Sequence, residues 1–267
     1  MKTLAVLAML LGCSLSAEAQ DRIEDNSFLL EEAYNQERGV VQHISAFARA
    51  AGGDWEYGFT QEWPFPDQRN QLSYTLPLSR LSNGTGGSRT RIGDISLHYR
   101  RQLLGIGGGA VAFSPRLSVL LPTGDAGSGH GAGGIGFQTN LPVSVLLSNR
   151  LVSHYNAGIT LIPSAQNTLG DEATVFGYNL GASLILLLTP RLNLMLEGGW
   201  GSTQEVVGGD LTSVVEEAFL NPGVRYAFDT RGGLQIVPGV AYTIGIGPSN
   251  GENGLFVYLS LEHAFRR

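Results

Sequence analysis

The chain has 267 residues, of which 15% are charged and 37 are glycine, and its formal net charge at pH 7 is −6. An average soluble domain carries about 25% charged residues and about 7% glycine. The negative net charge argues against a nucleic-acid-binding protein, because such proteins present a basic surface to phosphates. With 43% hydrophobic residues, the composition also excludes a disordered chain.

The first 19 residues have the pattern of a secretory signal peptide. Lys2 supplies the positive charge, residues 4–15 form the apolar region, and residues 17–19 form a small-x-small cleavage site. We therefore expect export and a mature chain that begins at Gln20. The single cysteine, Cys13, lies within this segment, so the mature chain has no thiol for a disulfide or a metal site. A lipoprotein site at Cys13 is the less favoured alternative.

Residues 20–38 show no alternation of apolar and polar residues. Residues 28–34 are rich in Glu, Leu and Ala, which favour a helix, and Ser27 is a suitable N-cap. The segment is too short and too acidic to cross a membrane. The sequence therefore predicts a short N-terminal helical segment before the first strand.

Apolar and polar residues alternate in eleven segments from residue 54 onward, each about as long as a membrane-spanning strand of roughly 9–11 residues. The apolar face of the first segment comprises Trp55, Tyr57, Phe59 and Trp63. A twelfth segment, around residues 40–49, has no clearly apolar face. The last segment, residues 255–265, ends on an aromatic residue close to the C-terminus, like the signal that the barrel assembly machinery recognises in outer-membrane proteins.

Short and long connections alternate along much of this part of the chain. Residues 148–150, 189–191 and 229–233 form short turns. The longer polar connections are residues 82–91, 124–135, 163–172, 201–217 and 245–254. This alternation is typical of a transmembrane barrel with short periplasmic turns and longer outer loops. Residues 39–267 are therefore predicted to form an all-β, antiparallel, up-and-down transmembrane barrel of 12 strands, with a soluble β-sandwich as the alternative.

Three prolines, Pro115, Pro222 and Pro238, fall inside predicted strands, where proline cannot donate a ladder hydrogen bond. Residues 221–226 and 237–242 share a Pro-Gly-Val-x-Tyr pattern. We interpret the two stretches as paired bulges or kinks.

Residues 25–37, DNSFLLEEAYNQE, resemble the mature N-terminus of the phenol meta-pathway degradation family of bacterial outer-membrane proteins, a family related to the channel that secretes functional-amyloid subunits. LPTGD at residues 121–125, the glycine-rich stretch after it and HYNAG at residues 154–158 also resemble that family. The resemblance extends over essentially the whole mature chain. It implies an outer-membrane barrel of 12 strands that acts in transport or secretion and has no catalytic residues.

Motifs for catalysis or cofactor binding are weak. GAGGIG at residues 131–136 matches a dinucleotide fingerprint by letter, but it leads into a strand rather than opening a helix, which favours a flexible loop. Ser82-Asn83-Gly84 faintly resembles outer-membrane phospholipase A, although Arg80 stands where the histidine is expected. The five histidines lack metal-ligand spacing. We therefore expect no enzyme activity, no metal and no cofactor.

Polar residues on the inward faces are the candidate functional residues, because an arginine facing lipid at the bilayer midplane costs about 2–4 kcal/mol. The predicted lumen-lining residues are Glu56, Glu62, Asp94, His98, Arg100, Arg116, His154, Asn156, Glu197, Arg225 and Glu262. They either line a pore or pair across the barrel as stabilising networks. Their mixed signs argue against a strongly ion-selective pore.

The predicted function is an outer-membrane channel or transporter for small solutes, aromatic or apolar compounds among them, in a Gram-negative bacterium. Barrels of about eight strands are filled by side chains and barrels of 16–18 leave an open channel, so 12 strands would leak unless the lumen is narrowed. We expect the N-terminal segment to plug or gate the lumen by pairing with its arginines. The predicted plug residues are Phe28, Glu31, Glu32 and Tyr34. A loose periplasmic leader is the alternative for this segment.

Other functions stay open at this point: a secretion channel, or a non-transporting barrel that serves as a structural protein, an adhesin or a lipid-modifying enzyme. The expected partners are outer-membrane lipid and lipopolysaccharide, the barrel assembly machinery through the C-terminal strand, and a small-molecule solute. A homotrimer is also expected from porin-like proteins, and no nucleic acid is expected.

Overall fold

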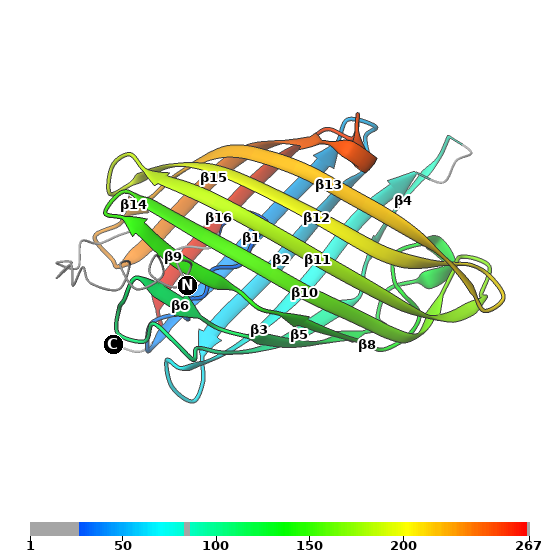
Figure 1. The fold of residues 1–267 in the computed structure, drawn as a ribbon, viewed down its shortest axis with the longest axis horizontal. Coiled ribbons are helices and arrows are strands. Elements are labelled where there is room, and N and C mark those ends of the chain that lie inside the picture. The colour runs from blue at the N-terminus through cyan, green and yellow to red at the C-terminus, as the bar shows by residue number, and fades with distance from the viewer. Residues whose placement is uncertain (1–26, 83–85, 266–267) are drawn as a thin grey trace, which may run out of the picture.

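The computed structural model describes residues 27–82 and 86–265. The predicted signal peptide, residues 1–19, and the first part of the predicted helical segment, residues 20–26, lie outside the described residues. The described strands form one closed, antiparallel, 12-stranded barrel (Figure 1). This confirms the predicted fold class and strand count.

The strands run up and down around the barrel in chain order. They are β1 (Val40–Ala50), β2 (Trp55–Pro64), β3 (Asn70–Ser82), β4 (Ser88–Ile92), β5 (Ile95–Arg101), β6 (Val111–Phe113), β7 (Arg116–Leu121), β8 (Gly136–Asn140), β9 (Val143–Ser148), β10 (Leu151–Gln166), β11 (Glu172–Leu187), β12 (Leu192–Gly208), β13 (Leu211–Tyr226), β14 (Phe228–Asp229), β15 (Leu234–Gly245) and β16 (Gly254–Ala264). Four barrel strands are interrupted and carry two labels each: β4–β5, β6–β7, β8–β9 and β13–β14. β1 pairs with both β2 and β16, which closes the barrel.

Proline accounts for two of the interruptions. Pro115 separates β6 from β7, and Pro142 separates β8 from β9, because a residue without an N–H cannot continue the ladder. Pro222 and Pro238 instead lie within β13 and β15, and the register runs unbroken past them on the β12 and β16 sides. Of the interpretation as paired bulges or kinks, the bulges are therefore wrong, although the β13–β15 ladder lacks the pairs at residues 221–222.

Side chains alternate between the two faces of the wall, as the sequence predicts. On β11 and β12, Leu180 and Leu194 face outward and are 55% and 43% exposed, whereas Ser183 and Glu197 face inward and are buried. An apolar outer surface and a polar interior are what a barrel in lipid requires. None of the helices in the described part of the chain has the length and hydropathy to cross a membrane.

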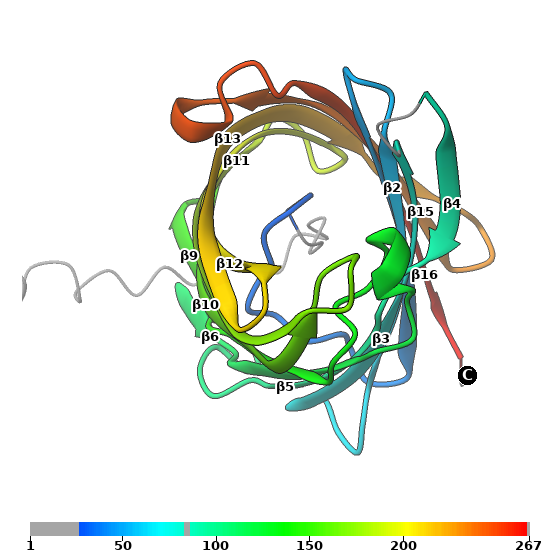
Figure 2. The same cartoon turned by 90° about the vertical axis from the view of Figure 1, so that its right-hand side faces the viewer.

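The largest difference between the predicted outer connections and the structure lies at residues 201–217. Residues 201–217 were expected to form a loop, but β12 and β13 continue through them and turn only at residues 209–210. At that same end of the barrel, residues 122–135 fold inward along one side of the lumen, with the short helix η1 (Ala126–Ser128) inside the ring of strands (Figure 2). The outer end of the barrel therefore combines a tall hairpin with an inward-folded loop.

The N-terminal segment is not helical over residues 27–38. It forms bends and irregular backbone inside the ring of strands, seen as the blue trace within the barrel in Figure 2. The helix prediction is wrong here because the backbone N–H groups donate to side chains of the barrel wall rather than to carbonyls of their own segment. Ser27 does not act as an N-cap either, since its hydroxyl donates to Ser183 Oγ at 2.8 Å.

Candidate functional site: the plugged lumen

Residues 27–38, called the plug below, cross the lumen as an extended segment that the wall holds through its polar side chains. The N–H groups of Leu29 and Leu30 both donate to Oε1 of Glu197, at 3.0 and 3.3 Å. Asn156 binds Glu31 through both halves of its amide, accepting from the Glu31 N–H at 2.9 Å and donating to its carbonyl oxygen at 2.8 Å. Two predicted lumen residues thus replace the hydrogen bonds that a helix would have made.

Serines and glutamines hold the middle of the plug. Ala33 is fully buried, its N–H donates to Ser144 Oγ at 2.8 Å, and its carbonyl accepts from Ser114 Oγ at 2.5 Å. Further along, the Gln36 N–H donates to Gln71 Oε1 at 2.8 Å. The wall therefore binds the plug chiefly through its backbone, which fixes the path of the segment more than the identity of its side chains.

Arg100 clamps the part of the plug that lies between these points. Its guanidinium donates to Asn35 Oδ1 at 2.9 Å, to the Glu32 carbonyl at 3.1 Å and to the Tyr34 carbonyl at 2.5 Å. The residue is only 3% exposed, so its charge is compensated by these oxygens rather than by water. Hydrogen bonds from an ionised donor are about twice as strong as neutral ones, which makes this clamp a strong contact.

An ion pair joins the plug to a second arginine. Glu31 Oε1 contacts a guanidinium nitrogen of Arg116, and Glu31 Oε2 lies 4.0 Å from Arg100. Arg116 also donates to Gln138 Oε1 at 2.7 Å, which orients it toward the plug. Both side chains of the Glu31–Arg116 pair are about one-fifth exposed, so water and salt screen the pair only in part.

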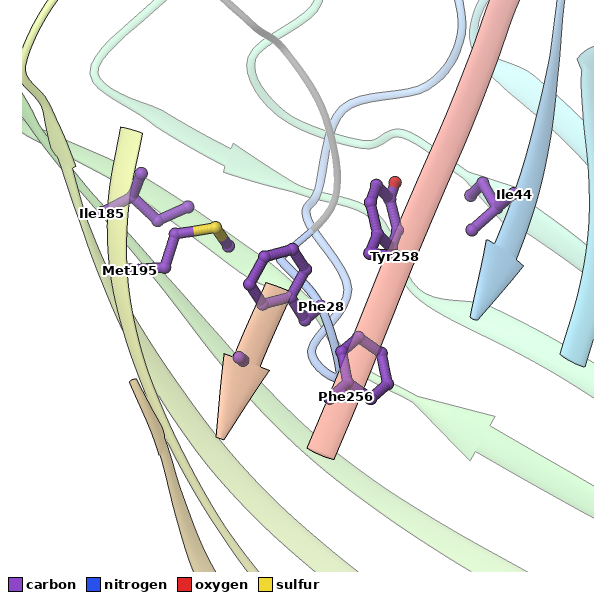
Figure 3. Packing of buried hydrophobic residues seen from close by; sticks show 7 residues of the cluster. Phe28, Ile44, Ile185, Met195, Phe256 and Tyr258 are labelled. Atoms are coloured by element: carbon purple, nitrogen blue, oxygen red, sulfur yellow. The ribbon is translucent and has the colours of Figure 1, made fainter. Parts of the chain in front are cut away.

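Phe28 is the apolar anchor of the plug. Its ring lies between Ile185 and Met195 on one side and Phe256 and Tyr258 on the other (Figure 3). The ring centroids of Phe256 and Tyr258 are 5.5 and 5.4 Å away, in tilted arrangements typical of aromatic pairs. Phe28 itself is 7% exposed. A largely polar lumen therefore contains one compact apolar pocket, and the plug fills it.

Two lumen-facing glycines make room for this ring. A Cβ on Gly223 would lie 2.5 Å from Cε2 of Phe28, and a Cβ on Gly239 would clash with Cε1 of the same ring. These are the glycines of the two Pro-Gly-Val-x-Tyr stretches, so the shared pattern leaves space for an aromatic ring against the wall. The wall residues that surround this ring are called the Phe28 socket below: Ile185, Met195, Gly223, Gly239, Phe256 and Tyr258.

The two predicted lumen histidines form hydrogen bonds within the wall. His98 Nδ1 lies 2.7 Å from Ser118 Oγ, and His154 Nδ1 lies 2.7 Å from Ser144 Oγ. Both histidines are buried. Because Ser144 also accepts the N–H of Ala33, His154 acts on the plug by fixing the orientation of the Ser144 hydroxyl.

Glutamates and the remaining arginine lie on the same inner surface. Glu62 is buried and accepts from Gln71 Nε2 at 2.7 Å, which holds Gln71 in place for the plug. Arg225 is buried on β13 opposite Asn193 of β12. Glu262, on β16, lies on the inward side near the end of the barrel where β1 begins and β16 ends. The predicted lumen set thus includes residues that touch the plug, residues that position them, and residues that lie elsewhere on the inner surface.

Above the plug, the outer half of the lumen holds a cavity of about 910 Å3. Its acidic lining residues are Asp54, Glu56, Asp94 and Glu205. Asp94 also shapes the mouth, since its two carboxylate oxygens accept from the N–H groups of Gly124 and Ala132 at 2.8 and 2.7 Å. The glycine-rich stretch is therefore a loop that leads into β8, as the sequence predicts, and it is folded against the wall.

Several residues of the site were not found from the sequence. Ser144, Ser183, Gln71 and the two socket glycines are small or neutral, and nothing in their local sequence distinguishes them from other inward-facing positions. The repeated Pro-Gly-Val-x-Tyr pattern was the one available signal for the socket. The role of this pattern is apparent only from its contact with Phe28, which lies about two hundred residues earlier in the chain.

No protein-family model matches the chain, and no curated protein is similar to it in sequence. Membership of the phenol meta-pathway degradation family therefore stays a prediction. Solved structures do share the fold. The COG4313 outer membrane channel from Pseudomonas putida F1 aligns with a TM-score of 0.59 at 12% identity, over 87% of this chain and 98% of the channel.

Two porins align over a similar length. The NanC porin has a TM-score of 0.54 at 7% identity, over 83% of this chain and 98% of the porin, and the KdgM porin has a TM-score of 0.51 at 7% identity, over 84% and 99%. Identities this low establish the common fold and not a common substrate. The chain has the fold of a bacterial outer-membrane β-barrel, as its alternating strands predict.

Proposed function

We propose that this protein is an outer-membrane channel for small solutes whose lumen is closed by the plug. The observation that carries the proposal is the path of residues 27–38, which cross the interior of a 12-stranded barrel and bind the wall from several sides. A barrel of this width is otherwise broad enough to pass small molecules.

The contacts of the plug suit a removable closure. Most are hydrogen bonds to polar side chains, and each bonded group can exchange its partner for water when the segment leaves, so the net free energy per bond is only about 1 kcal/mol. The plug has no regular structure of its own to unfold, and it joins β1 through Gly39, whose φ of 82° places it in the left-handed region. In the described part of the chain, the plug is therefore joined covalently to the barrel wall at a glycine and held elsewhere by noncovalent contacts.

The apolar socket in the lumen supports the choice of solute class. A pore for inorganic ions has no need of a buried aromatic cluster, whereas aromatic or apolar solutes would contact one on their way through. The acidic cavity above the plug further supports neutral or cationic solutes over anions, because its described lining includes four carboxylates and neither lysine nor arginine.

We propose that the two Ser–His pairs of the lumen are structural rather than catalytic. The hydroxyl of Ser144 already accepts the N–H of Ala33 in addition to its contact with His154. The hydroxyl of Ser118 belongs to a wall network in which His98 also contacts Thr75 and Ser96. Neither hydroxyl faces lipid, where an enzyme acting on membrane lipid would need its nucleophile.

Conductance in planar bilayers tests the proposal. We expect the full chain to conduct poorly and a variant lacking residues 21–38 to show a larger single-channel conductance. Heat-modifiable migration in gels serves as the control that the truncated barrel is folded. Equal conductance of the two proteins would place the segment outside the conducting path, and a folded truncated barrel that never conducts would overturn the channel function itself.

A further inference from the structure

The Phe28 socket has the composition of a ligand site for one aromatic ring. The side chain in it comes from the plug and not from the wall, so the wall contributes an aromatic and aliphatic lining that encloses a phenyl group completely enough to leave Phe28 7% exposed. Ile185, Met195 and Phe256 are each at most 4% exposed as well. The pocket is therefore apolar, small and closed to bulk water when it is filled.

The shape of the socket fits a flat ring in particular. Gly223 and Gly239 have no side chain between the backbone and the edge of the Phe28 ring, so the ring can lie directly against the strand backbone. Phe256 and Tyr258 meet the ring at interplanar angles of 46° and 53°, with centroids 5.5 and 5.4 Å away. Such tilted contacts favour an aromatic ring over a saturated one of the same size, because they use the ring quadrupole.

The socket is built by strands of the wall and not by the plug. Its walls are strands β11, β12, β13, β15 and β16, which pair in a constant register around it, although the β13–β15 ladder lacks the pairs at residues 221–222. When an apolar side chain is truncated inside an enclosed pocket of this kind, as in Phe28→Ala with the rest of the plug in place, the cavity stays dry and binds small aromatic molecules such as benzene. Withdrawal of the plug would thus expose a preformed ring-sized site inside the lumen.

We propose that the Phe28 socket binds the aromatic ring of a small solute, and that Phe28 and the solute compete for it. This inference rests on the proposed channel function and names its substrate class as single-ring aromatic compounds. In the closed barrel, Phe28 occupies the site as an internal ligand. A solute ring that takes its place removes the apolar anchor of the plug and leaves only the polar contacts to hold the closure.

Binding of 4-fluorophenol to the full-length protein in detergent, followed by 19F NMR, tests this proposal without measuring transport. The variant Phe28→Ala empties the socket and is expected to bind the probe at least about tenfold more tightly than the wild type, since the competing ring is gone. Phe137→Ala is the matched control: Phe137 lies on the outer face of β8 and is 51% exposed, so its truncation removes the same side chain away from the plug and should leave the affinity unchanged. Phe28→Leu serves as a second variant if Phe28→Ala does not fold.

A variant whose socket is blocked by a new side chain provides the second part of the test. Adding Gly239→Leu to Phe28→Ala places a new side chain where the ring lay and is expected to abolish the tight binding. Equal affinity of the wild type and Phe28→Ala, or tight binding that persists after Gly239→Leu, would overturn the proposal. Cyclohexanol that displaces the probe as well as phenol does would overturn its aromatic part.

The outcomes separate this inference from the channel function. A barrel that binds the probe in the socket but never conducts, even without its plug, would refute the channel and leave the socket in place. A channel that opens on truncation, but whose Phe28→Ala variant binds no better than the wild type, would refute the aromatic site alone.

Discussion

Replacing Arg100 with methionine is the single substitution that we expect to loosen the plug most. The arginine donates three hydrogen bonds to plug oxygens, on Asn35, Glu32 and Tyr34, at 2.5–3.1 Å. Each is worth at least about 1 kcal/mol net, even though the freed oxygens regain water when the plug leaves. The loss is therefore about 3 kcal/mol of closure free energy, which corresponds to about a 150-fold shift toward the open state.

Single-channel recording of open probability measures this shift directly. Arg101→Met is the matched control, because Arg101 follows Arg100 in β5 but is exposed on the opposite face of the strand. We expect Arg100→Met to open often and Arg101→Met to behave as the wild type. An Arg100→Met channel that stays closed as firmly as the wild type, with a normally folded barrel, would show that the clamp contributes nothing to closure.

Three further predictions follow from contacts described above. Glu31→Gln removes the charge that pairs the plug with its arginine, so we expect higher open probability and a weaker dependence of gating on salt in bilayer recordings than in the wild type. Phe59→Arg places a charge toward lipid near mid-strand and should destabilise refolding into bilayers by about 2–4 kcal/mol, whereas Thr60→Arg on the lumen side should cost far less; equal losses would invert our assignment of faces. In the mouth loop, the hydroxyl of Ser128 and other local contacts hold the pKa of Asp125 below its usual range. The ionised carboxylate therefore stabilises the loop fully at pH values above the ordinary aspartate pKa, and this stabilisation is lost as the pH falls through the lowered pKa. NMR titration should find the pKa of Asp125 raised toward its ordinary value in Ser128→Ala, and an unchanged pKa would assign the shift to another group.

The barrel wall was predictable from the sequence because its signal is local. In a strand between lipid and a polar lumen, each residue faces one of two very different environments, so Leu180 and Leu194 alternate with Ser183 and Glu197 in the sequence itself. The same reasoning explains the error at residues 201–217. Where β12 and β13 rise above the membrane, both faces meet water, and the alternation that identifies a strand disappears.

The plug was harder to predict because its conformation is set by distant residues. Glu and Leu at residues 29–32 favour a helix in isolation, but Glu197 and Asn156 offer the same N–H groups better-placed partners. Local preference gives way to tertiary contacts at such a site. The socket depends on three positions, Phe28, Gly223 and Gly239, that meet only once the barrel has closed.

The spread of the plug's partners around the wall has a consequence for assembly. Gln71 lies on β3, Asn156 on β10, Glu197 on β12 and Tyr258 on β16, so no partial sheet can hold residues 27–38 in their final path. The segment that is synthesised before every strand can therefore dock only after the last strand has joined the first. Burial of Phe28 would then mark the end of folding, and a newly inserted barrel would pass through a brief unsealed stage before its own N-terminus closed it.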